Sequence, residues 1–523
     1  MIMRYIYFLF VLFLCNVFVA SAQNFEEYKR QQQAKYNSYK SKKTEEFRAY
    51  RDRVNAEYAE YMRKAWTKEE AQPAKPLPKR PEPPKPEMRK PLDMPKFDAI
   101  PIGDIIASEK PDLKKPIPII PIAELERLVN NEKPNENVND NENHNDNVNL
   151  NGNENKIEAQ NEKPKAEGFA FQWCGQTWRV PLEAQHRFRL RGTKEGDVAV
   201  VWKTLSEAKY AGIIAACLKI RDSYQLPDWS YMQFLKAMAD AFLPGMKNEA
   251  RLLDMFILSQ SGYQVRIARS NDQLHLLVPS SGEIYEYTYL TIGGRKYYVT
   301  DKTSGRASFF VYERDFPREQ PFTWQISKLP LLSAESTTRT LKAQRYPEVE
   351  ATVNVNKGLV ELMSQYPRCN NCNYYALASL SEQAKKGLYP ALRQRIEGKN
   401  KLAAVDILLD FVQTAFKYQT DEQQFGDERP LFGDETLFYP YCDCEDRSIL
   451  FSILVRELVG LDVVLLSYPE HMATAVQFDD DVQGDHMMVD GKRYVVCDPT
   501  FIGSHVGEAM PRFKKAKATI IKL

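Results

Sequence analysis

The order of hydrophobic and polar residues divides the 523-residue chain into segments of different character. Residues 1–22 are almost entirely apolar after Arg4 and end in Ala20-Ser21-Ala22, which is typical of a secretory signal peptide cleaved after Ala22. An uncleaved anchor is the alternative, but the apolar core is short for a bilayer span of about 20 residues. We therefore expect an exported protein, periplasmic or associated with the outer envelope of a bacterium.

Residues 23–70 are mainly polar and carry aromatic pairs that recur every 11 residues. The pairs are Phe25 with Tyr28, Tyr36 with Tyr39, Phe47 with Tyr50, and Tyr58 with Tyr61. An 11-residue period is close to three turns of a straight helix, so the pattern predicts one long amphipathic helix with an aromatic stripe. The stripe over residues 25–61 needs a surface to pack against. Self-association or docking on the same chain would provide one, and an envelope protein partner is the alternative.

Residues 71–166 lack any hydrophobic period. Prolines recur every few residues up to about Pro121, which favours an extended, semi-rigid spacer. The chain then becomes rich in Asn, Glu and Asp, a composition that cannot bury a core and predicts disorder. The globular part is therefore expected to begin near Gly168, and it is long enough for two domains.

Near the C-terminus, the chain predicts a helix that is apolar on nearly all sides and begins at Cys444. Residues 449–459 leave almost no polar face, which indicates a buried helix, and Gly460 is suited to end it. A thiol at a helix N-terminus is favoured as a thiolate by the helix dipole and the free backbone N–H groups. Cys442 lies before the helix and lacks this advantage.

Two pairs of strands follow this helix. The stretch LDVVLLSYPEHMATAVQF predicts a strand, a turn and a second strand that opens at His471. The stretch HMMVDGKRYVVCDPTF predicts a hairpin around Asp490-Gly491, with Asp498 at its end. A thiolate nucleophile requires an adjacent imidazole and a carboxylate that orients it. Cys444, His471 and Asp498 supply these groups in that order along the chain.

The segments CEDRSILFSILVRELVGL, YPEHMATAV and YVVCDPTF together resemble the transglutaminase-like superfamily, over roughly residues 402–507. The DCED element is similar to that of bacterial transglutaminase-like cysteine proteinases. The resemblance implies a papain-like α+β fold in which Cys444 is the nucleophile, His471 the general base and acid, and Asp498 the orienting carboxylate. It implies a thiol hydrolase of the cysteine peptidase or amidase type, acting on peptide or amide bonds through a thioester.

Two other functions stay open. One is protein-glutamine transamidation, in which an amine resolves the thioester. No Trp follows Trp324, so the Trp-based oxyanion contribution of animal transglutaminases is missing from this domain, and hydrolysis is favoured. The other is a non-catalytic envelope adaptor.

An insertion before Cys444, KYQTDEQQFGDERPLFGDETLFYPY, is the expected source of specificity contacts, and its Gln424 is a candidate oxyanion donor.

The first half of the globular part repeats this plan without the cysteine. The segments NEARLLDMFILSQSG and GGRKYYVTDKT match the helix and hairpin described above, and they place Asn248, His275 and Asp301 at the positions of the triad. An amide cannot act as a thiolate, so this copy should be inactive. We predict two copies of a papain/transglutaminase-like domain, a degenerate one at 167–305 and a catalytic one at 306–523.

The net charge and the cysteine content limit the partners, disulfides and cofactors that can be expected. The net charge of +1 gives no sign of a nucleic-acid partner, so we expect a protein or peptide substrate. In an oxidising compartment, Cys369 and Cys372 are expected to form a local disulfide. No set of residues has the spacing of a metal site, and no cofactor is expected. Calcium bound by Glu445 and Asp446, or near Asp479-Asp480-Asp481, is kept as an alternative.

Overall fold

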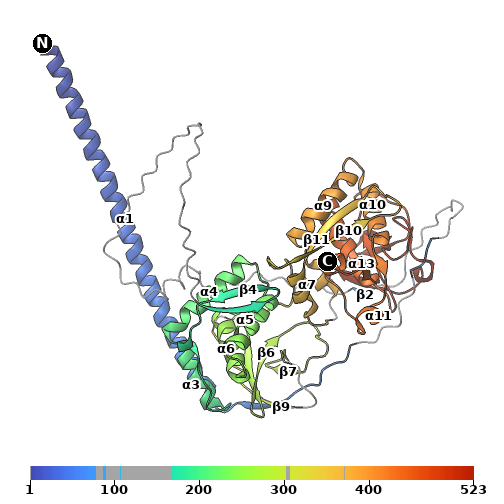
Figure 1. Ribbon diagram of the computed structural model, residues 1–523, viewed down its shortest axis with the longest axis horizontal. Helices are drawn as coiled ribbons and strands as arrows, with labels where there is room; N and C mark the ends of the chain where they lie inside the picture. The colour runs from blue at the N-terminus through green and yellow to red at the C-terminus, as the bar shows by residue number, and fades with distance from the viewer. Residues whose placement is uncertain are drawn as a thin grey trace.

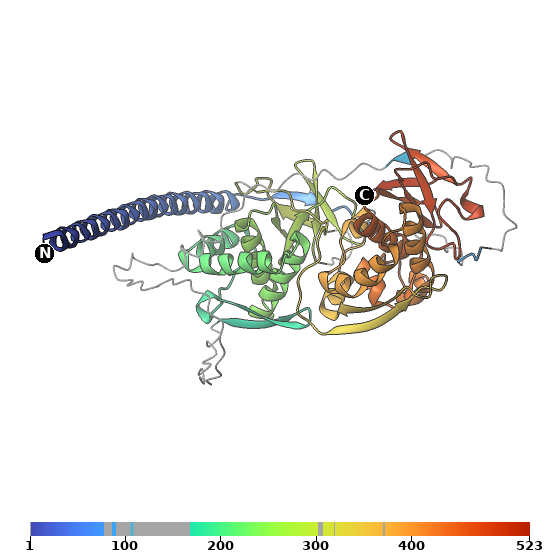
Figure 2. The ribbon, with the colours of Figure 1, turned by 90° about the horizontal axis from the view of Figure 1, so that it is seen from above.

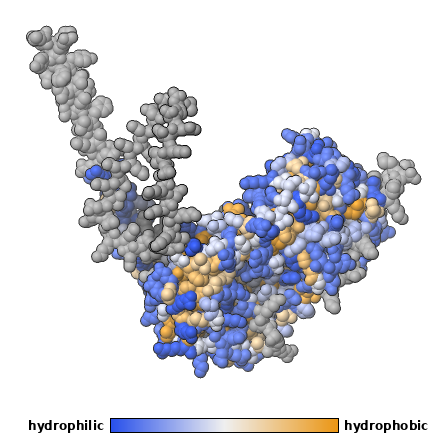
Figure 3. All heavy atoms as spheres, in the orientation of Figure 1, coloured by the Kyte–Doolittle hydropathy of each residue, from blue (hydrophilic) through white to orange (hydrophobic). Residues whose placement is uncertain are grey.

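The chain folds as a mixed α+β protein with a long helix ahead of two globular units (Figures 1 and 2). The computed structural model describes residues 2–77, 86–89, 106–107, 168–301, 307–317, 319–369 and 372–523, with backbone alone for 2–28, 106–107 and 208. One hydrophobic cluster runs through both units, where for example the rings of Trp229 and Tyr366 lie 5.1 Å apart. Figure 3 shows a mainly hydrophilic surface interrupted by hydrophobic patches.

The predicted long helix is α1, Ile2–Met62. Its C-terminal end packs on the first unit, where Tyr58 is fully buried against the rings of Trp202, Tyr312 and Phe316. The aromatic stripe therefore docks on the same chain at its last repeat. Farther from the unit, Tyr36 is 56% exposed, so self-association or an envelope partner for that part of the stripe stays a prediction.

The helix ends at Met62 and not near residue 70, as the sequence suggested. Residues Thr67–Glu70 instead form strand β1, which pairs with an edge of the first sheet. All four residues of this strand are polar and would fit a helix equally well, so the pairing partner decides its structure. The predicted signal peptide, residues 1–22, lies outside the part of the chain whose side chains are described.

The first unit contains a six-stranded antiparallel sheet with the order β1-β9-β5-β6-β8-β7. Its strands after β1 are β5 (Arg266–Ser270), β6 (Gln273–Pro279), β7 (Tyr289–Ile292), β8 (Arg295–Val299) and β9 (Ser308–Val311). The helices are α3 (Glu195–Leu205), α4 (Ala211–Ser223), α5 (Asp228–Phe242) and α6 (Lys247–Gln260), and a separate hairpin joins β3 (Phe169–Trp173) to β4 (Gln176–Val180). Helix α6 packs on β6 and carries its core residues on nearly every side.

The second unit contains another six-stranded sheet, with the order β16-β17-β15-β14-β18-β2. Its strands are β2 (Ile106–Ala107), β14 (Val463–Ser467), β15 (Met472–Val476), β16 (His486–Val489), β17 (Lys492–Cys497) and β18 (Thr519–Lys522). The helices are α7 (Lys357–Ser364), α8 (Cys372–Leu377), α9 (Glu382–Ile396), α10 (Lys401–Thr414), α11 (Asp421–Phe425), α12 (Gly433–Phe438) and α13 (Cys444–Leu454). Small pairs are formed by β10 (Ser336–Lys342) with β11 (Glu350–Asn356) and by β12 (Lys417–Tyr418) with β13 (Tyr441–Cys442).

The two six-stranded sheets have the same strand order when one of them is read from its other edge. Strands β5, β6, β8 and β7 of the first unit take the places of β14, β15, β17 and β16 of the second. Both β7–β8 and β16–β17 turn through two residues in the left-handed region, at Gly293-Gly294 and at Asp490-Gly491. Positive φ at both central positions gives the turn that matches the twist of antiparallel strands, which confirms the two predicted hairpins.

The boundary expected between residues 305 and 306 is too early. Strand β9, which begins at Ser308, still belongs to the first sheet, and Tyr263 forms a bridge with Gln320. Of the expected linker at 71–166, the described pieces pair with the globular units: Gln72 with Tyr289, Met88 with Ile502, and Ile106 of β2 with Thr519 of β18. The remainder of that linker lies outside the described residues.

The docking of α1 predicts a large effect for Tyr58→Ala. Removing this ring should lower the free energy of unfolding of the first unit by about 3–5 kcal/mol, because a cavity is left among three aromatic neighbours. Urea unfolding followed by tryptophan fluorescence, to which Trp202 contributes, measures the change. The matched variant Tyr36→Ala should change it by less than about 0.5 kcal/mol. Equal effects of the two variants would contradict the docking.

Candidate functional site

Helix α13 begins at Cys444, as the sequence predicts, and the thiol is only 2% exposed. The backbone of Asp443 precedes the helix, and its N–H donates to the Asp446 carboxylate at 3.2 Å, which caps the first turn. Gly460 follows the last turn in the left-handed conformation, as expected for a helix end. The helix packs on strand β15, where the Ser448 hydroxyl donates to the Met472 carbonyl at 3.0 Å.

His471 and Asp498 meet at one end of the second sheet. Strands β15 and β17 pair antiparallel, with Thr474 opposite Cys497, so the start of β15 lies beside the end of β17. The His471 Nε2 and the Asp498 Oδ2 are 2.9 Å apart, and both side chains are almost fully buried. The predicted imidazole–carboxylate pair is therefore present in the structure. With Nε2 committed to Asp498, the other ring nitrogen, Nδ1, is the one left to act on a thiol.

The imidazole is held flat by an aromatic ring that sequence reasoning missed. The ring of Phe513 stacks on His471 with centroids 4.8 Å apart and an interplanar angle of 17°, and the ring of Tyr468 lies 4.8 Å from Phe513. Phe513 lies far from His471 in sequence, in a segment without a motif, so no local pattern indicates the contact. The stack restricts rotation of the imidazole and keeps Nε2 directed at Asp498.

Asp498 is fixed by its own loop. Its Oδ1 accepts from the backbone N–H groups of Thr500 and Phe501 at 2.9 and 3.2 Å. Gln413 of α10 donates through Nε2 to the Asp498 carbonyl at 3.1 Å and to the Ser504 hydroxyl at 2.9 Å. These hydrogen bonds fix the position of the Asp498 carboxylate beside His471.

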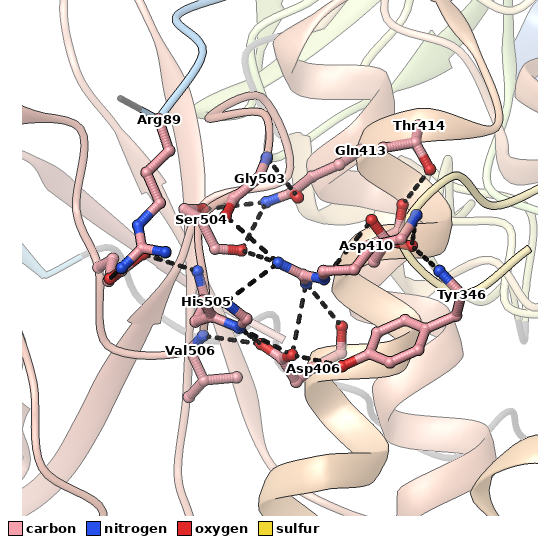
Figure 4. Close-up of polar contacts among 12 residues, drawn as sticks. Arg89, Tyr346, Asp406, Asp410, Gln413, Thr414, Gly503, Ser504, His505 and Val506 are labelled. Atoms are coloured by element: carbon pink, nitrogen blue, oxygen red, sulfur yellow. Dashed lines mark hydrogen bonds and ion pairs between the residues drawn. The ribbon is translucent and has the colours of Figure 1, made fainter. Parts of the chain in front are cut away.

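A second polar network holds the far side of the same loop (Figure 4). Arg345 donates to the carbonyls of Gly503 and Ser504 and forms ion pairs with Asp406 and Asp410 of α10. The Asp406 carboxylate also contacts the His505 Nδ1 at 3.0 Å. His505 is therefore committed to this network.

The Cys444 thiol is not hydrogen-bonded to the imidazole in this structure. It donates to the Glu445 carboxylate at 3.0 Å, while the His471 Nδ1 is buried without a hydrogen-bond partner among the described residues. Burial raises the pKa of the Cys444 thiol well above its usual value, and the Glu445 and Asp443 carboxylates raise it further, opposed by a hydrogen bond from the Met472 backbone. In this arrangement burial and the neighbouring carboxylates therefore oppose the thiolate that the helix N-terminus was expected to stabilise.

Four buried carboxyls gather around the start of α13. Asp421 from α11 joins Asp443, Glu445 and Asp446, with carboxylate oxygens within 4.8 Å of one another in overlapping groups. Burial first, and then the neighbouring acids, raises the pKa of Asp421, Asp443 and Asp446. The Asp443 Oδ1 is buried without a hydrogen-bond partner within the described part of the chain. These oxygen donors fit a hard divalent cation such as calcium.

The other acidic stretch considered for calcium does not fit. The Asp479 carboxylate pairs with Lys401, and the Asp481 carboxylate contacts Arg493 and Gln483 at the surface. Exposed acids paired with cations form an ordinary solvated turn. The buried carboxyls near Cys444 are therefore the calcium site that the structure supports better than the surface turn.

Two further predictions are not decided by the geometry. Gln424 is half-buried on α11, one turn after Asp421, and no hydrogen bond joins its amide to Cys444 within the described residues. Its role as an oxyanion donor stays a prediction. Cys369 and Cys372 are both thiols in this structure, and their disulfide stays a prediction for an oxidising compartment.

In the first unit, Asn248 is the second residue of α6. Its side chain binds the neighbouring β5–β6 hairpin. Its Nδ2 donates to the Asp272 carbonyl at 2.9 Å, and its Oδ1 accepts from the Leu274 N–H at 2.8 Å. His275 lies on β6, and Asp301 follows β8, where it forms an ion pair with Lys236 at 3.0 Å. The His275 imidazole and the Asp301 carboxylate are not hydrogen-bonded, although all three residues line one cavity.

Comparisons with protein-family models, with curated proteins and with solved structures find no match in any of the three. A search of the described helices for membrane spans finds none that is both long and apolar enough.

The contact between Cys444 and Glu445 predicts a measurable change in thiol reactivity. Glu445→Gln removes a negative charge that raises the thiol pKa, so the pKa should fall and alkylation by iodoacetamide at about pH 8 should become roughly tenfold faster, the effect of one pKa unit. The rate at Cys444 is measured across pH by peptide mass spectrometry. Glu422→Gln, an exposed change on α11, is the matched control. An unchanged pH profile in Glu445→Gln would contradict the assignment.

Proposed function

We propose that the second unit is a thiol hydrolase that cleaves peptide or amide bonds with Cys444, His471 and Asp498. The observation that carries the proposal is the buried pair of His471 and Asp498 at 2.9 Å, which leaves Nδ1 without a partner beside the helix that begins at Cys444. A merely structural histidine in such a place would normally have both nitrogens satisfied. The resemblance to transglutaminase-like cysteine proteinases agrees with the same three residues.

The chemistry requires the sulfur to turn from Glu445 toward the His471 Nδ1. The imidazole then takes the thiol proton as the sulfur attacks the substrate carbonyl, and the imidazolium passes this proton to the departing amine. A thioester to Cys444 remains. Water attacks it, His471 takes a proton from that water, and the sulfur leaves and regains the proton as the carboxylic acid is released.

Asp498 and the first turn of α13 stabilise the two charges that develop in this cycle, the imidazolium and the oxyanion. Asp498 accepts from Nε2–H, fixes the tautomer, and stabilises the imidazolium while it exists. The free backbone N–H groups at the first turn of α13 are suited to the oxyanion that develops on the substrate. Both groups act only when charge appears, so they favour the transition state over the bound substrate.

Hydrolysis is favoured over amine transfer because the chain has no Trp after Trp324, so the second unit lacks the Trp of animal transglutaminases. An amine acceptor must also reach the thioester through a site in which Cys444 is 2% exposed. Water reaches such a site more readily than a lysine side chain carried by a second protein. Transamidation remains the second outcome that the activity assay distinguishes.

The first unit is proposed to be a silent copy of the second. The shared strand order supports this, as do the matched hairpin turns. A further detail agrees: buried Arg251 follows Asn248 by three residues, as buried Arg447 follows Cys444. Asn248 provides no nucleophile, and its amide is already bound to the β5–β6 turn.

Calcium is proposed to bind the carboxyls of Asp421, Asp443, Glu445 and Asp446. Their mutual repulsion and the unpartnered Asp443 oxygen support this. When bound, the ion would supply positive charge that offsets the carboxylates. A carboxyl whose pKa is raised by folding holds its proton more tightly in the folded state, so without a cation the cluster lowers stability as pH rises above the ordinary range of Asp and Glu.

An activity assay tests the proposed function. The mature protein is incubated with calcium and an unfolded, alkylated protein substrate, and new termini are identified by mass spectrometry. Cys444→Ala should abolish cleavage, and Asp498→Asn should slow it at least about 100-fold, because the imidazole loses its orienting anion. His486→Ala is the matched histidine control, since His486 lies on β16 and contacts the Gly484 carbonyl. Incorporation of an added primary amine in place of cleavage would favour transamidation.

A thermal-unfolding measurement tests the calcium site. Calcium at about 100 times its dissociation constant should stabilise the protein by about 2.7 kcal/mol, equivalent to a rise of roughly 2–4 °C in the melting temperature. Asp421→Asn should remove the rise and also raise the melting temperature without calcium, because repulsion is relieved. Asp479→Asn, on the surface turn, should keep the rise. A shift that survives Asp421→Asn would contradict the site.

A further inference from the structure

The part of α1 that extends away from the first unit differs in charge from the part that docks on it (Figures 1 and 2). After residue 44, acids and cations are mixed, and Phe47 and Tyr50 are partly buried against the hydrophobic cluster that contains Tyr58. Residues 29–43 contain six cations and no acid. These cations are Lys29, Arg30, Lys35, Lys40, Lys42 and Lys43. The aromatic stripe therefore continues from the docked part into a purely basic segment.

The lysines of this basic segment lie on the same side of the helix as its tyrosines. Tyr36 and Tyr39 are 56% and 62% exposed. The Lys40 Nζ lies 5.5 Å from the centre of the Tyr36 ring, and the Lys43 Nζ lies 5.9 Å from the centre of the Tyr39 ring. The other lysines, at helical spacings of three, four or seven residues from one of these tyrosines, are Lys29, Lys35 and Lys42.

The opposite side of the segment is small and carries little charge. At 100° per residue, that side consists of Ala34, Asn37, Ser38 and Ser41 with one cation, Arg30. Every side chain from residue 29 to 43 is exposed except that of Lys40, which is partly covered. The segment therefore has one face that is basic and aromatic, and this face is accessible to a partner.

The described part of the chain does not neutralise this face. Lys43 pairs with Glu46 at 2.7 Å, but both side chains are about half exposed, and such surface pairs contribute little. Neither Lys35, Lys40 nor Lys42 forms an ion pair with any residue that the structure describes. Several positive charges are therefore left to attract an anionic partner.

A second copy of the helix does not fit the face. Two parallel copies would bring lysines beside lysines without an acid between residues 29 and 43, and like charges at such distances repel. An antiparallel copy would need the residues after 44, where Phe47 and Tyr50 already pack on the hydrophobic cluster. The charge of the face is complementary to an anionic surface and not to itself.

We propose that residues 29–43 of α1 bind an anionic phospholipid surface, with the tyrosines among the head groups and the lysines against the phosphates. Tyrosine has an apolar ring and a polar hydroxyl, and such side chains collect where a membrane meets water. Lysines beside them cover apolar surface with their stems and extend their ammonium groups to the phosphates. The segment also begins shortly after Ala22, where the expected export signal ends. This binding does not depend on chemistry at Cys444.

Co-sedimentation with sucrose-loaded vesicles tests the proposal, with the whole chain from Gln23 onward. Vesicles of phosphatidylcholine containing about 30% phosphatidylglycerol should bind it at least about tenfold more tightly than phosphatidylcholine alone at about 0.1 M salt. Salt at about 0.5 M should remove most of this difference, because it screens the charges. Equal binding to both kinds of vesicle, or no binding to either, would overturn the proposal.

A triple variant assigns the binding to this face. Lys40→Gln, Lys42→Gln and Lys43→Gln together should weaken binding to the anionic vesicles roughly 100-fold, since each lysine near such a surface contributes to affinity. Glutamine favours helix as lysine does, so α1 is kept. The matched control removes three exposed lysines outside α1, in Lys328→Gln, Lys386→Gln and Lys399→Gln, and should bind as the parent does. Equal losses in the two triple variants would overturn the proposal.

The double variant Tyr36→Ala, Tyr39→Ala separates a lipid surface from other occupants. Loss of two rings from the head-group region should weaken vesicle binding at least about fivefold, and unchanged binding would contradict the proposal. Displacement of the vesicles by an equal charge concentration of single-stranded DNA would show that a nucleic acid is the better partner and would overturn it. A dimer found by sedimentation equilibrium that the double variant dissociates would show that a second copy covers the face, with the same consequence.

Discussion

The antiparallel pairing of β15 with β17 is the constraint on which the proposed site depends. It brings the start of one strand beside the end of the other, so that His471 and Asp498 meet at 2.9 Å although they are far apart in sequence. Helix α13 packs on β15 and places Cys444 at the same end. A shift of one residue in this register would turn the side chains to the opposite face and separate the group.

The two units share one strand order but differ at this place in the fold. In the second unit, acids crowd the start of α13, bury the thiol and raise its pKa. In the first unit, the corresponding amide binds a backbone turn, and a cavity remains open in front of it. The start of α13 in the second unit thus carries a buried thiol, whereas the start of α6 in the first unit lines a cavity. Helix α1 is attached to the first unit by the burial of Tyr58.

The sequence predicts the local elements of the site well. The apolar run after Cys444, the turn at Asp490-Gly491 and the strand that opens at His471 each follow from short-range patterns, and each is present. Long-range contacts were not predictable in this way. Phe513 stacks on His471, and Asp421 joins the acids of α13, without any periodic signal in either segment.

The edge strands of the first sheet also depend on long-range contacts that short-range patterns do not predict. Strands β1 and β9 have four residues each, and β1 is polar throughout, so their membership in the first sheet is decided by the partner strand and not by their own residues. The state of the thiol is a further case. The helix dipole favours a thiolate at Cys444, whereas burial and the neighbouring Glu445 raise the pKa of the thiol. Neither burial nor the position of the Glu445 side chain can be obtained from the spacing of residues in the sequence.

The central claim is that Cys444 and His471 act as one unit when a substrate is bound. A peptidyl vinyl sulfone tests it most directly, because its electrophilic carbon reacts with a thiolate only where a donor protonates the adjacent carbon. Intact mass and peptide mapping should show one adduct, on Cys444, that is lost in His471→Ala and retained in His486→Ala. Adducts spread over several cysteines, or equal labelling of Cys444 in His471→Ala, would contradict the account.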